Sequence, residues 1–124
     1  MQKELIENNP ILKLTLEFSL LMVEYCDVLQ SLKKFTVANQ LIRSGTAIGA
    51  NSLEAQNAES RADFIHKLKI AAKEADETQY WLIVCEYAKD YPDPQVLVQK
   101  LVEVQKVLSS ILGTAKRKAS LNAV

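Results

Sequence analysis

The side chains with the clearest chemical potential are one arginine and three glutamates grouped around a long uncharged segment. Between residues 36 and 53 the only ionised side chain is Arg43, and Glu54, Glu74 and Glu77 follow it. Carboxylates in a helical bundle can hold two metal ions, but the ferritin-like site needs Glu-x-x-His motifs on facing helices, which this sequence lacks. Arginine offers five donors in a planar fork and suits a buried carboxylate pair. We predict that Arg43 is largely buried and pairs with Glu74 or Glu77, so that its removal costs about 3–5 kcal/mol.

Two uncharged polar residues, Ser44 and Asn51, lie in the apolar seam of the same segment. Buried polar groups need hydrogen-bond partners. We therefore predict a structural polar network here and no catalytic site. Its expected members are Arg43, Ser44, Asn51, Glu54, Glu74 and Glu77.

The glycines of this segment, Gly45 and Gly49, are four residues apart and so share one face of a helix. They do not form a phosphate loop, because the preceding strand and the Gly-Lys-Ser/Thr ending are missing. Each glycine costs about 0.5–1 kcal/mol relative to alanine inside a helix. Such a cost indicates close packing against a neighbouring helix.

The other reactive side chains form no catalytic or metal-binding pattern. His66 is the only histidine, and neither Cys26 nor Cys85 is close to it in the sequence. Metal sites need several ligands at suitable spacing. The cysteines fall in apolar helical patterns, as expected of small core residues in a reducing cytoplasm. We expect no metal, no cofactor and no enzymatic activity.

Basic residues are the candidates for contact with RNA or DNA. They are Arg61, Lys67, Lys69, Lys73, Lys116, Arg117 and Lys118. Acidic residues are interleaved with the first four, so an ordinary solvated face remains an alternative. The aromatic residues Tyr80, Trp81 and Tyr87 could stack on bases, or instead fill a core end or a subunit contact.

Four helices at approximately 10–33, 36–58, 61–89 and 94–116 are expected to position these residues. Apolar residues recur at alternating three- and four-residue spacing in each, which is the seam of a helix packed in a bundle. Asn9-Pro10, Thr36, Ser60 and Asp93-Pro94 provide the starting signals. Short connections favour antiparallel neighbours. The fold class predicted is all-α, an antiparallel up-down-up-down four-helix bundle, with frayed residues 119–124.

A second apolar stripe on the first of these helices indicates a homo-oligomer. It consists of Leu12, Leu16, Leu20 and Val23. One seam is enough to pack a helix within its own bundle, so a second seam needs another surface. Contiguous apolar patches of this kind are uncommon on monomers.

Length and charge set the remaining limits. The chain has 124 residues, which suits one domain over 1–124, and its 15 basic residues balance 15 acidic ones. Global charge therefore gives no argument for nucleic acid. No apolar run reaches the roughly 18 residues of a membrane span, and Met-Gln-Lys-Glu opens no signal segment. We expect a cytoplasmic protein without membrane contact.

Two gapless stretches resemble a known bacterial family. The first reads Gln40-Leu41-x-Arg43-Ser44-x-x-x-Ile48-x-x-Asn51-x-x-Glu54-Ala55. The second reads Ser60-x-x-Asp63-Phe64-x-x-Lys67-Leu68-x-Ile70-Ala71-x-Lys73-Glu74-x-x-Glu77-Thr78-x-Tyr80-Trp81-Leu82. Both are similar to the four-helix-bundle family named for open reading frames in intervening sequences of 23S ribosomal RNA genes, over roughly residues 11–115.

The resemblance implies a helical bundle that assembles into a ring, typically a pentamer, with no established enzymatic activity. It also implies similarity to the accessory protein of diversity-generating retroelements, a basic ring that binds nucleic acid and a reverse transcriptase. This chain departs from that protein in having no net positive charge. The expected function is an oligomeric, non-enzymatic scaffold or adaptor for nucleic acid or a nucleic-acid enzyme. The alternatives are a purely protein-binding assembly partner and an enzyme with an unrecognised site.

Overall fold

The computed structural model describes residues 2–122, and these form five α-helices. They are α1 (Gln2–Asn8), α2 (Pro10–Ser31), α3 (Phe35–Ala55), α4 (Arg61–Tyr87) and α5 (Gln95–Asn122). The all-α prediction is confirmed for this part of the chain, which contains no strand. The number of helices is five, where the sequence pattern predicted four.

The helix starts are set by local hydrogen bonds. The Asn9 side chain accepts from the backbone N–H groups of Ile11 and Leu12 at 3.1 and 3.4 Å, and Pro10 occupies the first helical position. Ser60 Oγ accepts from the Asp63 N–H at 3.1 Å, while Asp63 accepts from the Glu59 N–H at 3.2 Å. The bonds to the N–H groups of Ile11, Leu12 and Asp63 satisfy donors that would otherwise be unpaired in the first turn. The bond from Glu59 ties the residue before the N-cap to the same turn.

The predicted cap at Thr36 is wrong. Helix α3 starts one residue earlier, at Phe35, and its N-cap Lys34 makes no side-chain capping bond. The connection is instead closed by the backbone, since Lys33 has a φ of 62° and the Lys34 N–H donates to Leu29 O at 2.8 Å. This backbone turn closes the end of α2, and no side chain caps the start of α3.

Other helix boundaries also differ from prediction. Helix α1 was missed because its seven residues are too few to show a seam, although Leu5 and Ile6 pack against the core. Helix α3 ends at Ala55, before the predicted residue 58, and α4 ends at Tyr87. Helix α5 continues to Asn122, so the expected fraying of 119–122 is wrong, and residues 123–124 lie outside the described residues.

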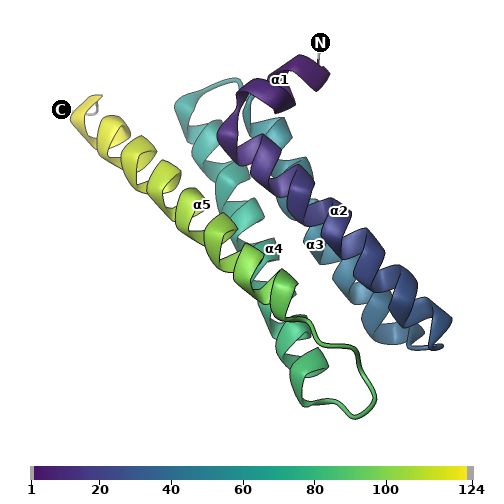
Figure 1. Ribbon diagram of the computed structural model, residues 1–124. Coiled ribbons are helices and arrows are strands. Elements are labelled where there is room, and N and C mark those ends of the chain that lie inside the picture. The colour runs from purple at the N-terminus through teal and green to yellow at the C-terminus, as the bar shows by residue number, and fades with distance from the viewer. Residues whose placement is uncertain (1, 123–124) are drawn as a thin grey trace.

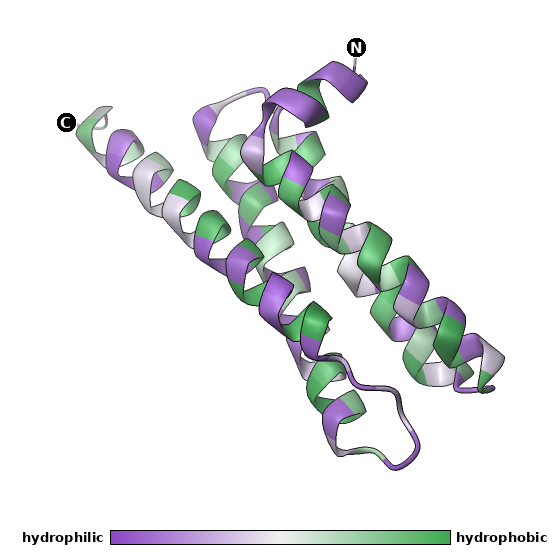
Figure 2. Cartoon of the chain, viewed as in Figure 1, coloured by the Kyte–Doolittle hydropathy of each residue, from purple (hydrophilic) through white to green (hydrophobic). Residues whose placement is uncertain are grey.

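Helix α3 lies between α2 and α4 and makes the most extensive contacts with them (Figure 1). Helix α5 packs on α4 and, less extensively, on α2, where Lys100 Nζ lies 3.0 Å from Glu17 Oε2. The C-terminal end of α5 diverges from α2 (Figure 1). Apolar residues line the inner sides of the long helices (Figure 2), and the largest fully buried side chains include Phe18, Met22 and Leu68.

No helix within residues 2–122 is both long and apolar enough to cross a membrane.

Candidate functional site

Arg43 joins α3 to two carboxylates of α4. Its Nη1 lies 3.5 Å from Glu74 Oε2, and its Nη2 contacts Glu77 Oε2. Gln40 accepts from Nη2 at 3.3 Å, and Trp81 Nε1 donates to the same Glu77 oxygen at 3.3 Å. The structure therefore brings together the residues predicted to pair.

The predicted burial of Arg43 is wrong, because 51% of its side chain is exposed in the single chain. Its position at the edge of the α3–α4 seam lets the guanidinium reach both glutamates from the solvent side. Water then screens the pair, and its contribution to stability is far smaller than that of a buried pair.

Replacing Arg43 with methionine should therefore cost no more than about 1 kcal/mol of unfolding free energy, against the 3–5 kcal/mol expected of a buried pair. Urea denaturation of the variant and the wild type, in low and high salt, measures this difference. We expect the difference to shrink in high salt, because exposed pairs are screened. A loss above about 3 kcal/mol would mean that Arg43 is desolvated, as in a subunit contact.

The other predicted members of the polar network do not join Arg43. Asn51 Nδ2 donates within its own helix, to Ala47 O at 2.8 Å, and Glu54 is exposed. Ser44 is fully buried and accepts a 2.9 Å hydrogen bond from Thr78 Oγ1 of α4. Sequence reasoning placed Thr78 in the apolar seam of α4 but missed this link, which depends on how the two helices align.

The glycine pair lies where α3 approaches α2 closely. A Cβ built on Gly45 would lie 2.9 Å from Met22 Cε, and one on Gly49 would lie 3.2 Å from both Cβ and Oγ1 of Thr15. Thr15 and Met22 are fully buried residues of α2. The close helix contact predicted from the spacing of the glycines is thus present within one chain.

Three ionisable side chains, those of Tyr25, Cys26 and Cys85, lie near the connection between α4 and α5. Tyr25 donates a hydrogen bond to Pro92 O at 2.7 Å, and the free thiols of Cys26 and Cys85 are both buried. Burial raises the pKa of Cys26 from 9.0 to about 11, and burial likewise raises the pKa of Tyr25 and of Cys85. Protonated thiols are poor nucleophiles, so we assign these side chains to packing of the core and not to a reactive site.

The Cys26 pKa predicts loss of stability in alkali. Below pH 9.0 the thiol is protonated in both the folded and the unfolded chain, so its contribution is fully present. From 9.0 to about 11 only the unfolded chain releases the proton, so the unfolding free energy should fall as the pH rises. Urea midpoints measured across this interval should fall more steeply in the wild type than in Cys26→Ala. If the urea midpoints of the two proteins fall equally with pH, the Cys26 thiol is not the cause of the alkaline loss of stability.

The basic residues proposed for nucleic acid do not form one patch. Lys67 lies 3.8 Å from Asp63 in an ion pair, whereas Lys69 and Lys73 are exposed one turn apart on the outer face of α4. Three successive basic positions, 116–118, point in different directions around α5, because neighbouring helix residues are about 100° apart. Of these, Lys118 shares a hollow with Arg61.

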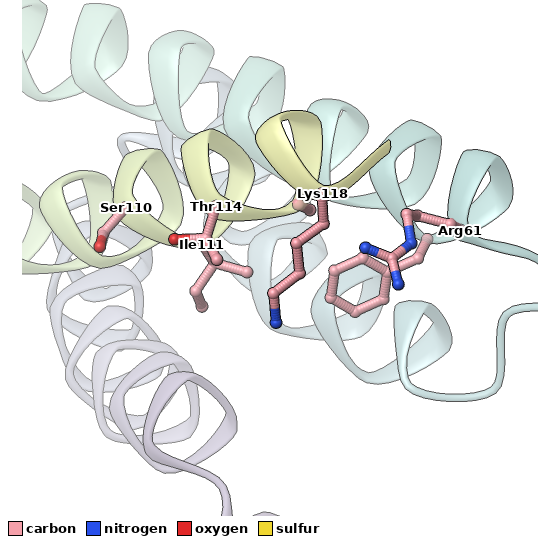
Figure 3. A pocket seen from close by; sticks show the side chains of 7 residues that line it. Arg61, Ser110, Ile111, Thr114 and Lys118 are labelled. Atoms are coloured by element: carbon pink, nitrogen blue, oxygen red, sulfur yellow. The ribbon is translucent and has the colours of Figure 1, made fainter. Parts of the chain in front are cut away.

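That hollow is a pocket of about 560 Å³ between the start of α4 and the end of α5 (Figure 3). Its lining residues are Arg61, Phe64, Ser110, Ile111, Thr114, Ala115 and Lys118. It lies toward the C-terminal end of α5, which diverges from α2 (Figure 1). The sequence pattern did not predict it, because its two sides are nearly fifty positions apart in the chain.

The aromatic cluster lies at the other half of α4. Tyr80 and Trp81 pack edge to face with ring centroids 5.4 Å apart, and Tyr80 and Tyr87 are both largely exposed. Lys34 Nζ lies 4.9 Å from the centre of the Tyr91 ring. The exposed rings are too far along α4 from Arg61 to join the pocket.

An apolar band covers the outer side of α2. Leu16, Leu20 and Val23 are 44%, 58% and 41% exposed, whereas Leu12, predicted for the same stripe, is buried in the chain's own core. A groove of about 160 Å³ runs beside the band, between α2 and α3. It is lined by Ile6, Leu12, Thr15, Leu16, Ser19, Thr46, Gly49, Ala50 and Leu53. No charged side chain lines it.

In the described part of the chain, no three His, Cys, Asp or Glu side chains are grouped closely enough to hold a metal ion. His66 is exposed on α4.

Comparison with known proteins identifies a matching family and a similar crystal structure. A model of the family described as 23S rRNA-intervening sequence protein matches residues 7–110. A crystal structure from Bacteroides thetaiotaomicron, described as a protein with unknown function from the S23 ribosomal protein family, superposes with a TM-score of 0.77. The two chains are 40% identical, over 82% of this chain and 97% of the other. No curated protein matches the sequence. With most of its length matched and the fold shared, the chain belongs to the family of 23S rRNA-intervening sequence proteins.

Proposed function

We propose that this protein is a non-enzymatic scaffold that assembles from several copies of itself, with α2 to α5 acting as one up-down-up-down bundle. The observation that carries the proposal is the apolar band of Leu16, Leu20 and Val23, together with the uncharged groove beside it. The resemblance noted in the sequence implies a ring, typically a pentamer, so five copies are the favoured number. The two buried, reduced thiols fit a reducing compartment, so we place the assembly in the cytoplasm.

The composition of the band and the groove supports contact with a second copy. Soluble chains rarely expose contiguous apolar surface without a partner. The α3 side of the groove presents the small residues Thr46, Gly49 and Ala50, which let another helix approach closely. Since this side carries no charge, a subunit can cover it without leaving an ion unpaired.

A single charge placed in the band tests the proposal. Leu20→Asp should convert the assembly into monomers, because an unpaired carboxylate would have to be buried at the subunit contact. Its helical circular dichroism should be unchanged, because Leu20 is exposed within the chain. Sedimentation velocity of the variant and the wild type measures the effect.

The matched control is Val102→Asp, an equally charged change at a half-exposed apolar position of α5, beside α4 and away from the groove. This variant should keep the size of the wild-type assembly. If Leu20→Asp and Val102→Asp sediment alike, the band is not the subunit contact.

Nucleic acid is a second candidate partner, favoured by the outer face of α4. Lys69 and Lys73 are exposed there, and neither forms an ion pair within residues 2–122. Glu74 and Glu77, which follow them in the sequence, contact Arg43 instead. Repetition of this face around an oligomer would strengthen a weak phosphate contact through avidity.

Fluorescence anisotropy with labelled RNA and duplex DNA tests this candidate. At about 50 mM salt we expect binding that weakens with salt, each neutralised phosphate adding about 0.7–0.9 to the log–log slope. The double variant Lys69→Gln, Lys73→Gln should lower that slope, while Lys106→Gln on α5 should not. Absence of binding by the intact assembly would favour the alternative function, a purely protein-binding assembly partner.

A further inference from the structure

The pocket between the start of α4 and the end of α5 lies apart from both surfaces discussed above. None of its lining residues belongs to the apolar band, to the groove beside it or to the outer lysines of α4. Its volume of about 560 Å³ falls in the range of small-molecule sites, roughly 300–1,000 Å³. The family match ends at residue 110, before Ile111, Thr114, Ala115 and Lys118, so that match by itself assigns the pocket no role.

Two cations and no carboxylate line this pocket. Arg61 extends from the first turn of α4 with its guanidinium turned toward α5, and Lys118 extends from α5 into the same space (Figure 3). Neither forms an ion pair within residues 2–122. Arginine binds phosphate through two parallel hydrogen bonds, and lysine adds a point charge. Two positive charges favour a dianion such as a phosphate monoester over a single carboxylate.

The rest of the lining is suited to an apolar, flat group with polar edges. Phe64, Ile111 and Ala115 provide apolar surface, and the Phe64 ring is only half buried. Ser110 and Thr114 are exposed one turn apart on α5, and both residues line the pocket (Figure 3). The Thr114 hydroxyl accepts from Arg117 Nη2 at 3.3 Å and keeps its own proton free to donate. Aromatic rings stack on nucleobases without regard to sequence, and hydroxyls bond to sugar or base edges.

We propose that this pocket binds a nucleoside monophosphate group. The phosphate lies between Arg61 and Lys118, the base lies against Phe64, and the hydroxyls of Ser110 and Thr114 bond to the polar edges of the nucleoside. Such a group has two sources, a free nucleotide or the 5′-phosphorylated end of a nucleic-acid strand. The proposal does not rest on self-association, because the pocket is formed within one chain.

Isothermal titration calorimetry with the full chain tests the pocket. The probes are AMP, CMP, a 5′-phosphorylated dinucleotide, adenosine and inorganic phosphate. Arg61→Gln and Lys118→Gln should each weaken binding of the phosphorylated nucleosides by about tenfold or more, through loss of one charge-assisted contact. Phe64→Leu should weaken the binding of nucleotides by about fivefold or more and leave the binding of inorganic phosphate unchanged.

Lys106→Gln is the matched control, since it removes an equal charge from an exposed position of α5 outside the pocket. Binding of AMP or CMP that both pocket variants weaken identifies a free nucleotide. Binding confined to the phosphorylated dinucleotide, with the same losses, identifies a strand end. Lack of binding by every phosphorylated probe at millimolar concentration overturns the proposal, as does equal loss in Lys106→Gln. Circular dichroism confirms that each variant is folded.

Discussion

Replacing Gly49 with leucine is expected to destabilise the protein by about 1–3 kcal/mol, the usual cost of overpacking a close helix contact. Even a Cβ at this position would lie 3.2 Å from the Thr15 side chain. Thr15 has little freedom to move, because it is buried and donates to the carbonyls of its own helix, Ile11 O at 2.8 Å and Leu12 O at 3.2 Å. The clash must therefore push α2 and α3 apart. Thermal and urea unfolding measure the loss.

Gly113 supplies the control for the intrinsic effect of replacing a helical glycine. A Cβ there would meet only Arg117 Nη1, at an ordinary 3.7 Å. Gly113→Ala should therefore stabilise the protein by about 0.5–1 kcal/mol through helix propensity alone. If Gly49→Leu leaves the melting temperature unchanged, the close approach of α2 and α3 at Gly49 is wrong.

The second large effect is expected at the buried hydroxyl pair between α3 and α4. Thr78→Val should cost about 1–3 kcal/mol, because Ser44 Oγ, which still donates to Gln40 O at 3.0 Å, loses the hydroxyl that it contacts on α4 where water cannot replace it. Both residues are fully buried, and the bond between them is 2.9 Å long. Each hydroxyl also bonds within its own helix, Ser44 to Gln40 O and Thr78 to Glu74 O. The double variant Ser44→Ala, Thr78→Val leaves neither hydroxyl without its partner on the other helix, so it should cost less than the sum of the single changes.

Thr46→Val is the matched control for this cycle. Its hydroxyl bonds only within its own helix, to Ile42 O at 2.6 Å and Arg43 O at 3.5 Å, and the residue is half buried. The expected change is within about 0.5 kcal/mol. Urea unfolding of the four proteins of the cycle gives the coupling energy, and strict additivity would show that the hydroxyls do not interact.

The four long helices were predictable because the apolar residues that they bury recur at three- and four-residue spacing in the sequence. Leu68, Ala75 and Leu82, expected in the seam of α4, are all fully buried or nearly so. The start of α2 at Pro10 could be predicted because Asn9 and Pro10 act as local helix-start signals, which need no tertiary contacts. Helix α1 had no such pattern, since its stability comes from packing of Leu5 and Ile6 on the core.

The candidate sites were less predictable because they depend on where faces meet. The pairing of Arg43 with glutamates of α4 could be predicted because Arg43 is the only charged residue in its segment. Its exposure could not be predicted, because the spacing of residues does not specify how near the edge of the α3–α4 contact Arg43 lies. The pocket at Arg61 and Lys118 was missed because α5 continues as a helix past residue 116 and diverges from α2. The available signal was apolar Ile111 and Ala115, which continue the seam of α5 into the pocket.

Multi-angle light scattering of the wild-type protein at micromolar concentration tests self-association most directly. One chain has a mass of 13.9 kDa. We expect a single species at a whole multiple of that mass, with five copies favoured, that persists on dilution through the micromolar range. A mass of 13.9 kDa for the folded protein at these concentrations would contradict the scaffold proposal.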